Sequence, residues 1–260
     1  MAKILAITNQ KGGVGKTTTS VNLAASLAAA KRRVLLIDLD PQGNATMGSG
    51  VDKRALQYTV YHVLLGSQNI ADVRVISTRG KYDLIPANRD LAGAEIEMVN
   101  LSRRETRLRE ALQEMESEYD FILIDCPPAL NLLTLNGLCA ASAVMIPMQC
   151  EYYALEGLSD LVNTIKKVRT NLNPMLEIEG LLRTMFDPRN ILAQQVSDQL
   201  QQHFGNKVYR TVIPRNVRLA EAPSFGVPAL YHDKLSKGTQ AYLALAGEML
   251  TRDRASATPG

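Results

Sequence analysis

The chain has 260 residues and a formal net charge of +3. This length suits one large α/β domain, and no Pro/Gly/Ser-rich linker, internal repeat or low-complexity tract divides it. The small net charge, with acidic residues among the basic ones, does not by itself indicate a nucleic-acid-binding protein. No apolar run approaches the ~18 residues of a membrane span, and no leader-like segment precedes the first predicted strand. We expect one domain over residues 1–250, a disordered tail over 251–260, and a soluble cytoplasmic protein.

The first predicted elements are a strand, a glycine-rich turn and a helix. Residues 3–8 (KILAIT) form a short apolar run typical of a buried strand, and residues 17–30 have the Ala and Leu content and spacing of a helix. The turn between them reads NQKGGVGKTT, residues 9–18. In this order of elements, the first N–H groups of the helix and the positive end of its dipole point at an anion held in the turn.

The turn resembles a phosphate-binding loop but departs from the general pattern. In G-x-x-x-x-G-K-[ST], glycines let backbone N–H groups converge on phosphate oxygens, the lysine reaches the β and γ phosphates, and the hydroxyl residue binds Mg²⁺. Gly15, Lys16 and Thr17 occupy the last three positions, whereas Gln10 stands where the first glycine belongs. A second lysine, Lys11, precedes the glycines, so the loop is a variant with one lysine more than phosphate binding requires.

Further along the chain, apolar runs alternate with helical stretches. Such a pattern indicates a mostly parallel sheet covered by helices on both faces, and therefore the α/β class. In these folds ligands bind at the carboxyl ends of the strands. The predicted strands after the first are VLLIDLD (34–40), YDLIPA (82–87), FILIDCP (121–127), AVMIPM (143–148), EGLLRTMF (179–186) and VYRTVIP (208–214).

Three aspartates stand at the carboxyl ends of predicted strands. Asp125 ends FILID, where it can hold a water bound to Mg²⁺; the alternative is that it caps the turn before the next two prolines. Asp38 and Asp40 alternate along their strand and share a face. One can orient a nucleophilic water while the other supports the metal or the loop, and turn formation in DPQGN remains an alternative for each.

The chain has three cysteines. Cys126, Cys139 and Cys150 show no C-x-x-C spacing, so we interpret each as a small buried hydrophobe and not as part of a zinc site or disulfide framework.

Several segments of the chain resemble the ParA/Soj family of chromosome- and plasmid-partitioning ATPases, specifically its short chromosomal branch. These segments are KGGVGKTTT, VLLIDLDPQGNAT, FILIDCPP, QCEYYALEGL and VIPRNVRLAEAPS. The resemblance runs in order over residues 1 to about 250.

The resemblance implies a P-loop NTPase fold, bound ATP and Mg²⁺, and a slow ATP hydrolase. Lys11 corresponds to the signature lysine of a deviant Walker A loop, which touches phosphates bound by the other subunit of an ATP-sandwich homodimer. Asp40 would orient the attacking water, and Glu151 and Tyr152 would line the interface. The nucleotide-binding set that it implies is Gly12, Gly13, Val14, Gly15, Lys16, Thr17, Thr18, Pro214 and Asn216, with Thr17 and Asp125, and less firmly Asp38, on the metal side.

The resemblance also implies ATP-dependent, sequence-nonspecific binding of double-stranded DNA, with nucleoid association and a ParB-like partner that stimulates hydrolysis. Arg189 and Arg218, followed by Arg215, are the DNA-contacting residues it indicates, and an ordinary solvated arginine is the alternative for each. The first strand begins at Lys3, so the N-terminal helix-turn-helix domain of the longer plasmid relatives is not expected.

Three other classes share such a loop. A MinD-like division-site ATPase needs a C-terminal amphipathic membrane helix, and TRDRASATPG has no basic face opposite an apolar one. A relative of the nitrogenase iron protein needs cysteines of two chains around a cluster, which the positions of Cys126 and Cys139 disfavour. A metabolic synthetase needs a substrate pocket, and no pattern in the sequence indicates one.

Overall fold

The computed structural model describes residues 2–257. Within this range eight strands form one sheet in the order β3-β4-β2-β5-β1-β6-β7-β8, and every neighbouring pair is parallel except β3 with β4. This confirms the predicted α/β class. All seven predicted strands are present. The strands are β1 Lys3–Ile7, β2 Val34–Asp38, β3 Val75–Ser77, β4 Tyr82–Ile85, β5 Phe121–Asp125, β6 Ala143–Met148, β7 Glu177–Phe186 and β8 Val208–Pro214.

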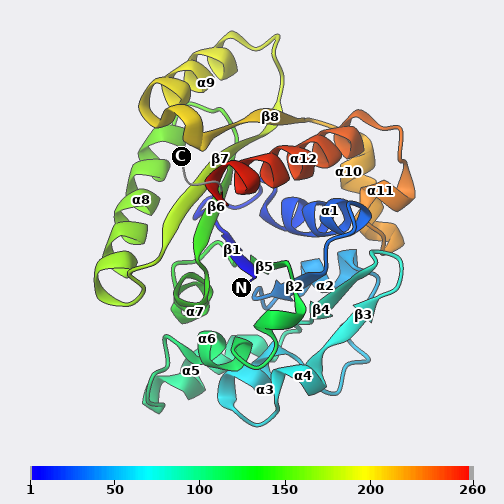
Figure 1. The fold of residues 1–260 in the computed structure, drawn as a ribbon, viewed down its shortest axis with the longest axis vertical. Helices are drawn as coiled ribbons and strands as arrows, with labels where there is room; N and C mark the ends of the chain where they lie inside the picture. Colours follow the sequence, from blue (N-terminus) through cyan, green and yellow to red (C-terminus); the bar gives the residue numbers. More distant parts are fainter. Residues whose placement is uncertain (1, 258–260) are drawn as a thin grey trace.

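Helices cover both faces of the sheet (Figure 1). One face carries α1 Lys16–Ala29, α2 Asn44–Gly48, α10 Val217–Glu221, η4 Ala222–Phe225, α11 Ala229–His232 and α12 Lys237–Ala257. The other carries α3 Val60–Leu65, α4 Ile70–Val73, α5 Leu91–Glu97, α6 Arg107–Leu112, α7 Leu132–Ala140, α8 Ala154–Asn171 and α9 Ile191–Phe204. The short 3₁₀ turns η1 Met98–Asn100, η2 Glu116–Glu118 and η3 Gly205–Lys207 complete the chain. Over residues 2–257, no helix has the length and apolar character needed to cross a bilayer.

Two hydrophobic clusters, one on each face, bury the central strands. Successive side chains of a strand point to opposite faces, so Leu36 packs with α1 and α12 while Leu35 and Ile37 pack with the other helices. All three side chains are fully buried. The near-continuous apolar sequence of these strands follows from burial on both sides.

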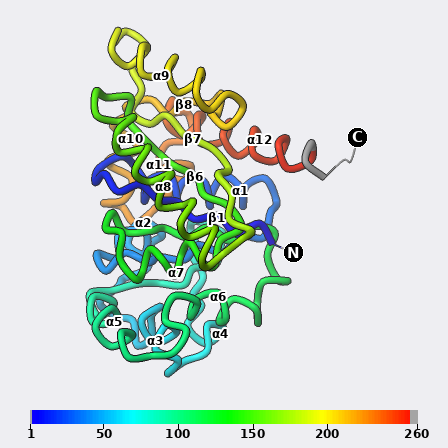
Figure 2. The backbone as a smooth tube through the Cα atoms, turned by 90° about the vertical axis from the view of Figure 1, so that its left-hand side faces the viewer, coloured from blue at the N-terminus to red at the C-terminus, as the bar shows by residue number. Residues whose placement is uncertain are grey.

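The carboxyl and amino ends of the parallel strands lie on opposite sides of the molecule. Figure 2 shows the N-terminus and the end of α12 on one side, and α2 and α10 on the other. The loop before α1 and the aspartates Asp38 and Asp125 therefore share the second side, because β1, β2 and β5 run in parallel and Asp38 lies beside Asp125 in the register.

The sequence did not predict strand β3, and it misjudged the C-terminal tail. Strand β3 has three residues, lies antiparallel at the edge of the sheet, and leaves Ile76 67% exposed, so its apolar signal is weak. The predicted disordered tail is wrong for residues 251–257, which continue α12. Arg252 donates to the carbonyl of Val208 and pairs with Glu248, and these contacts with distant or preceding residues stabilise the helix. Residues 258–260 lie outside the described residues.

Candidate functional site

The turn between β1 and α1 has the backbone geometry of an anion cradle. Gly13 and Gly15 have φ values of +74° and +89°, a region that side-chain-bearing residues rarely adopt. Gly15 is also the N-cap of α1 and has no side chain to cap the helix. The N–H groups of the first turn of α1, which lack intrahelical partners, are thus left for a ligand at the positive end of the helix dipole.

Lys16 lies within this turn and is nearly buried, with 7% of its surface exposed. Its Nζ donates a hydrogen bond to the carbonyl oxygen of Lys11, 3.1 Å away, which folds the side chain back along the loop. Burial lowers the pKa of Lys16, and the nearby carboxylates of Asp125 and Asp40 partly offset this effect. The ammonium group is therefore short of solvation, and a phosphate would compensate for that loss.

Asp125 ties the start of α1 to the end of β5. The carboxylate is fully buried and accepts hydrogen bonds from the hydroxyls of Thr17 and Ser20, both at 2.8 Å. Burial, together with the charge of neighbouring Asp38, raises the pKa of Asp125 above its ordinary value. A cation beside this carboxylate would favour its ionised form. The position thus fits the predicted role on the metal side.

Asp38 and Asp40 have different surroundings, which the sequence could not distinguish. Fully buried Asp38 accepts hydrogen bonds from the backbone N–H and the hydroxyl of Thr46, at 2.8 and 2.7 Å, and from the N–H of Asp40 at 3.1 Å. Asp40 is only partly buried, and within residues 2–257 one of its carboxylate oxygens accepts no hydrogen bond. This arrangement favours Asp38 as the support of the loop and leaves Asp40 free to bind a water.

An apolar cavity of about 230 Å³ adjoins the loop at the end of β8. Gly15 and Thr18 border it on one side, and Pro214 and Asn216 on the other. Asn216 also caps α10, because its side-chain oxygen accepts a hydrogen bond from the N–H of Leu219 at 3.3 Å. The structure thus places the two residues expected to contact adenine beside the phosphate loop, although they lie far from that loop in the sequence.

Lys11 is directed away from its own loop. Its Nζ forms an ion pair with the carboxylate of Glu151, and both side chains are about half exposed, at 49% and 50%. The backbone N–H of Lys11 donates to the side-chain oxygen of Asn9 at 3.0 Å. Glu151 precedes two strongly exposed tyrosines, Tyr152 and Tyr153. The side chain of Lys11 is thus at the surface on the nucleotide side and bound to a carboxylate of its own chain.

The predicted DNA-contacting arginines are exposed, but two of them are paired. Arg189 binds Asp187 through two nitrogens, at 2.8 and 3.0 Å. Arg218 contacts Glu221 at 2.9 Å and Asp233 at 3.3 Å. Within residues 2–257, Arg215 forms no ion pair, and it borders the cavity at the end of β8. The positive charges of Arg189 and Arg218 are therefore partly compensated, which the sequence alone did not indicate.

Several residues that hold the site together escaped prediction. Ser20 lies three residues after Thr17, so one helical turn brings both hydroxyls to Asp125, a spacing that was legible in the sequence. No pattern in the sequence indicates that Thr46 and Thr184 help to hold the site. The hydroxyl of Thr184 on β7 donates to the carbonyl of Val14 at 2.7 Å, a contact between residues 170 positions apart.

Comparisons with known proteins agree with this geometry. Residues 2–178 match a family described as an AAA domain. The chain is 55% identical over 249 residues to the sporulation initiation inhibitor protein Soj of Bacillus subtilis strain 168, covering 96% of this chain and 98% of Soj. It is 52% identical over 254 residues to the chromosome partitioning protein ParA of Caulobacter vibrioides strain NA1000, covering 97% and 95%.

A solved structure shares the fold over almost the whole chain. Cobyrinic acid a,c-diamide synthase from Mycobacterium smegmatis, with a bound ATP analogue and magnesium, superposes with a TM-score of 0.86 at 37% sequence identity. The match covers 98% of this chain and 97% of the synthase. The fold is therefore found in a protein whose structure contains an ATP analogue and magnesium.

The raised pKa of Asp125 predicts a pH-dependent stability. A carboxyl whose pKa is raised by folding contributes its stability below the unfolded pKa of about 4, and loses that contribution as the pH rises through the folded value. In the nucleotide-free chain we expect Asp125→Asn to gain stability relative to wild type as the pH rises, by up to about 1.4 kcal/mol per pH unit. Urea unfolding at a series of pH values measures the difference.

Asp120→Asn is the matched control, because its effect on stability should change with pH in the opposite direction. Hydrogen bonds from Arg33 lower the pKa of Asp120, so this carboxylate stabilises the fold above its unfolded pKa, and the contribution is lost as the pH falls. The Asp120→Asn variant should lose stability relative to wild type as the pH rises. A difference between Asp125→Asn and wild type that does not change with pH would show that folding does not raise the pKa of Asp125.

Proposed function

Because this chain belongs to the ParA/Soj family of chromosome-partitioning ATPases, we propose that it hydrolyses ATP to ADP and phosphate in a cycle that segregates chromosomes or plasmids. The observation that carries the proposal is the hydrogen bond of 2.8 Å between Thr17 and buried Asp125, next to Lys16 at the start of α1. The partitioning relatives are also more similar in sequence, at 52% and 55%, than the synthase at 37%.

We propose that residues 12–18 hold the phosphates of ATP and that Lys16 contacts the β and γ phosphates. Thr17 would bind Mg²⁺, with Asp125 acting through a water, while Pro214 and Asn216 would contact adenine. The bound metal would neutralise phosphate charge. The support is geometric and electrostatic: the glycine φ values open the cradle, the apolar cavity adjoins it, and burial and the charge of Asp38 raise the pKa of Asp125, which a cation would offset.

Asp40 is the residue we propose for orienting the attacking water. Its free carboxylate oxygen and partial exposure suit that role, and its charge acts on Lys16 of the same site. Among residues 2–257 we assign no glutamate as a general base, which fits the proposed slow hydrolase. A well-placed proton acceptor contributes about 10² to 10⁴ in rate, and a site without one turns over slowly.

We propose that Lys11 reaches the phosphates of a second ATP-bound copy of the chain. It would supply a positive charge in trans, as an arginine finger does, only when two loaded copies meet. Its exposure on the nucleotide side and the neighbouring exposed tyrosines Tyr152 and Tyr153 support an interface there. ATP would then be part of the dimer contact, and residues 1–250 would act as one ATPase domain.

The proposed dimer would bind double-stranded DNA without sequence preference through Arg189, Arg218 and Arg215. Two copies double the number of phosphate contacts, and each neutralised phosphate adds about 0.9 to the slope of log affinity against log salt concentration. DNA affinity would thereby report the nucleotide state. A ParB-like partner would stimulate hydrolysis and reset the cycle on the nucleoid, in the cytoplasm.

DNA binding measured without nucleotide, with ADP, with ATP and with a nonhydrolysable analogue tests the function. We expect tight binding only with ATP or its analogue, equal affinity for unrelated duplexes, and a steep loss of affinity with added salt. A MinD-like ATPase would instead bind lipid vesicles in the ATP state, and an iron–sulfur reductase would be coloured. DNA binding that ignores the nucleotide would contradict the proposal.

The in-trans role of Lys11 predicts that Lys11→Ala separates nucleotide binding from pairing. The variant keeps Lys16 and the glycine N–H groups, so it should bind ATP as a monomer while wild type forms a dimer. Size-exclusion chromatography with light scattering, in the presence of the nonhydrolysable analogue, measures the mass. Lys16→Ala should fail earlier, at nucleotide binding itself. A normal dimer of Lys11→Ala would assign the second lysine to another role.

The proposed DNA contact of Arg218 predicts a change in the salt dependence. Arg218→Ala removes one phosphate contact from each subunit, so the slope of log affinity against log salt concentration should fall by about 2 for the dimer. Arg103→Ala removes the same charge from a side chain that is 76% exposed and pairs with Glu110. Filter binding over a salt series compares the two. An equal change in both variants would indicate a diffuse charge effect.

A further inference from the structure

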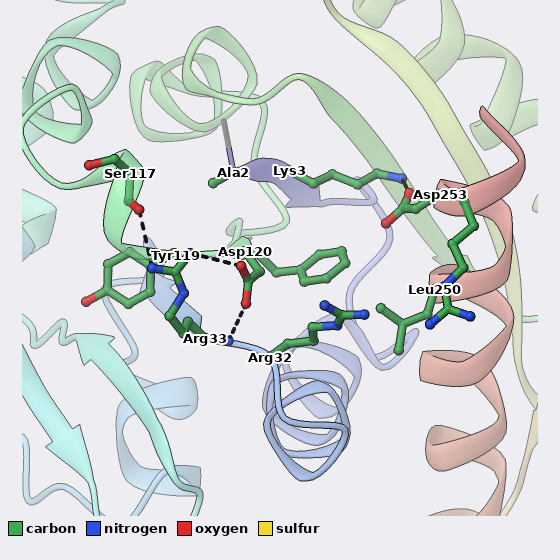
Figure 3. A pocket seen from close by; sticks show the side chains of 11 residues that line it. Ala2, Lys3, Arg32, Arg33, Ser117, Tyr119, Asp120, Leu250 and Asp253 are labelled. Atoms are coloured by element: carbon green, nitrogen blue, oxygen red, sulfur yellow. Dashed lines mark hydrogen bonds and ion pairs between the residues drawn. The ribbon is translucent and has the colours of Figure 1, made fainter. Parts of the chain in front are cut away.

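A cavity of about 710 Å³ lies at the amino ends of the strands, on the side opposite the phosphate loop. Residues at the starts of β1, β2 and β5 line it, and the last turns of α12 close one side (Figure 3). Helix α1 runs between the two places, and its 14 residues span roughly 21 Å. The cavity is therefore separate from the nucleotide site and belongs to no part of the proposed ATPase cycle.

Two of the basic residues around this cavity are fully engaged. Lys3 pairs with Glu179 at 2.8 Å and with Asp253 of α12. Arg33 binds the carboxylate of Asp120, with 3.0 Å between Nη2 and Oδ1. Figure 3 shows Asp253 beside Lys3 and Asp120 beside Arg33. These pairs compensate one another's charges, so they shape the walls without attracting a ligand strongly.

Arg32 differs from both. Within residues 2–257 its side chain forms no hydrogen bond or ion pair, and its Nε is buried without any partner. In Figure 3 the side chain extends across the cavity toward Leu250 of α12. Buried donors are nearly always paired in folded proteins, and an exception calls for a specific explanation such as a missing ligand.

The helix end beside Arg32 does not satisfy the guanidinium. Arg32 follows the C-terminus of α1, where free carbonyl groups would ordinarily attract a cation. Backbone N–H groups already bind these carbonyls: Ala30 donates to Ser26, Lys31 to Ala28 and Arg32 itself to Leu27, at 2.9 to 3.1 Å. The side chain is thus left to face the cavity.

We propose that this cavity binds a small molecule that carries one oxyanion, a phosphate ester or a carboxylate, on an apolar body, with Arg32 as its anchor. The planar guanidinium presents paired N–H groups that match both kinds of oxyanion. Phe121 and Leu250 supply apolar wall, and the volume lies within the range of small-molecule sites. Asp120 and Asp253 stand in the same lining, where they already pair with Arg33 and Lys3.

The arginine side-chain Nε–Hε signals in a ¹⁵N-resolved NMR spectrum of the full chain test the proposal. The probes are phenyl phosphate and benzoate, with benzyl alcohol as the neutral analogue of the same size. We expect saturable movement of the Arg32 signal with at least one anion and none with the alcohol. Arg32→Gln assigns the signal, and should weaken anion binding, followed on backbone amides of the lining residues, about tenfold or more.

Arg33→Gln is the matched control, because Arg33 lines the same cavity but is bound to Asp120. It should change anion affinity less than about threefold, and ATP hydrolysis should be unaffected by either variant.

Arg32→Lys keeps the charge without the planar guanidinium and replaces Arg32→Gln in the test if a thermal melt shows that Arg32→Gln does not fold. Binding of phenyl phosphate alone would identify a phosphate ester, and binding of benzoate alone a carboxylate. Absence of movement with both anions, or equal losses in the Arg32 and Arg33 variants, would overturn the proposal.

Discussion

The close approach of two buried carboxylates at the carboxyl ends of β2 and β5 organises this side of the molecule. Asp38 and Asp125 are neighbours in the parallel register and both are fully buried. Burying a carboxylate is costly unless hydrogen bonds compensate it. Thr17 and Ser20 of α1 supply those bonds to Asp125, and Thr46 supplies them to Asp38. The helix that carries the phosphate loop and the segment that carries Asp40 are therefore held in place by the same pair of acids.

This pair also explains why the site is suited to a cation. Burial raises the pKa of both carboxylates, and the charge of Asp38 raises that of Asp125 further. Burial lowers the pKa of the nearby Lys16 ammonium group, which is therefore itself poorly solvated. Both imbalances would be relieved by a ligand that brings a metal ion and phosphates together. The charges of the site are thus suited to its proposed ligand.

The sequence predicted the parts of the fold that depend on local pattern. Buried parallel strands are continuous apolar runs, and the glycine turn and Asp125 follow such runs directly, so they were recognised in the correct places. Strand β3 was missed because three residues at an edge leave little apolar signal. The end of α12 was misjudged because Arg252 and Asp253 look solvated in sequence, whereas they contact Val208 and Lys3, which lie far away along the chain. Similarly, only the folded chain shows that Arg218 is paired with Asp233 and that the hydroxyl of Thr46 donates a hydrogen bond to Asp38.

The ion pair between Lys11 and Glu151 bears on how the proposed dimer would form. An in-trans contact requires Lys11 to exchange one carboxylate for the phosphates of the second copy. Both side chains are about half exposed, and pairs of this kind contribute only about 0–1 kcal/mol because water and salt screen them. Phosphates in an interface that excludes water carry more charge in a lower local dielectric, so Lys11 would bind them more strongly than it binds Glu151. Glu151 can therefore hold the lysine in an extended, surface-directed position without impeding pairing. Without ATP in both copies the same lysine would meet no phosphate, and the pair with Glu151 would persist.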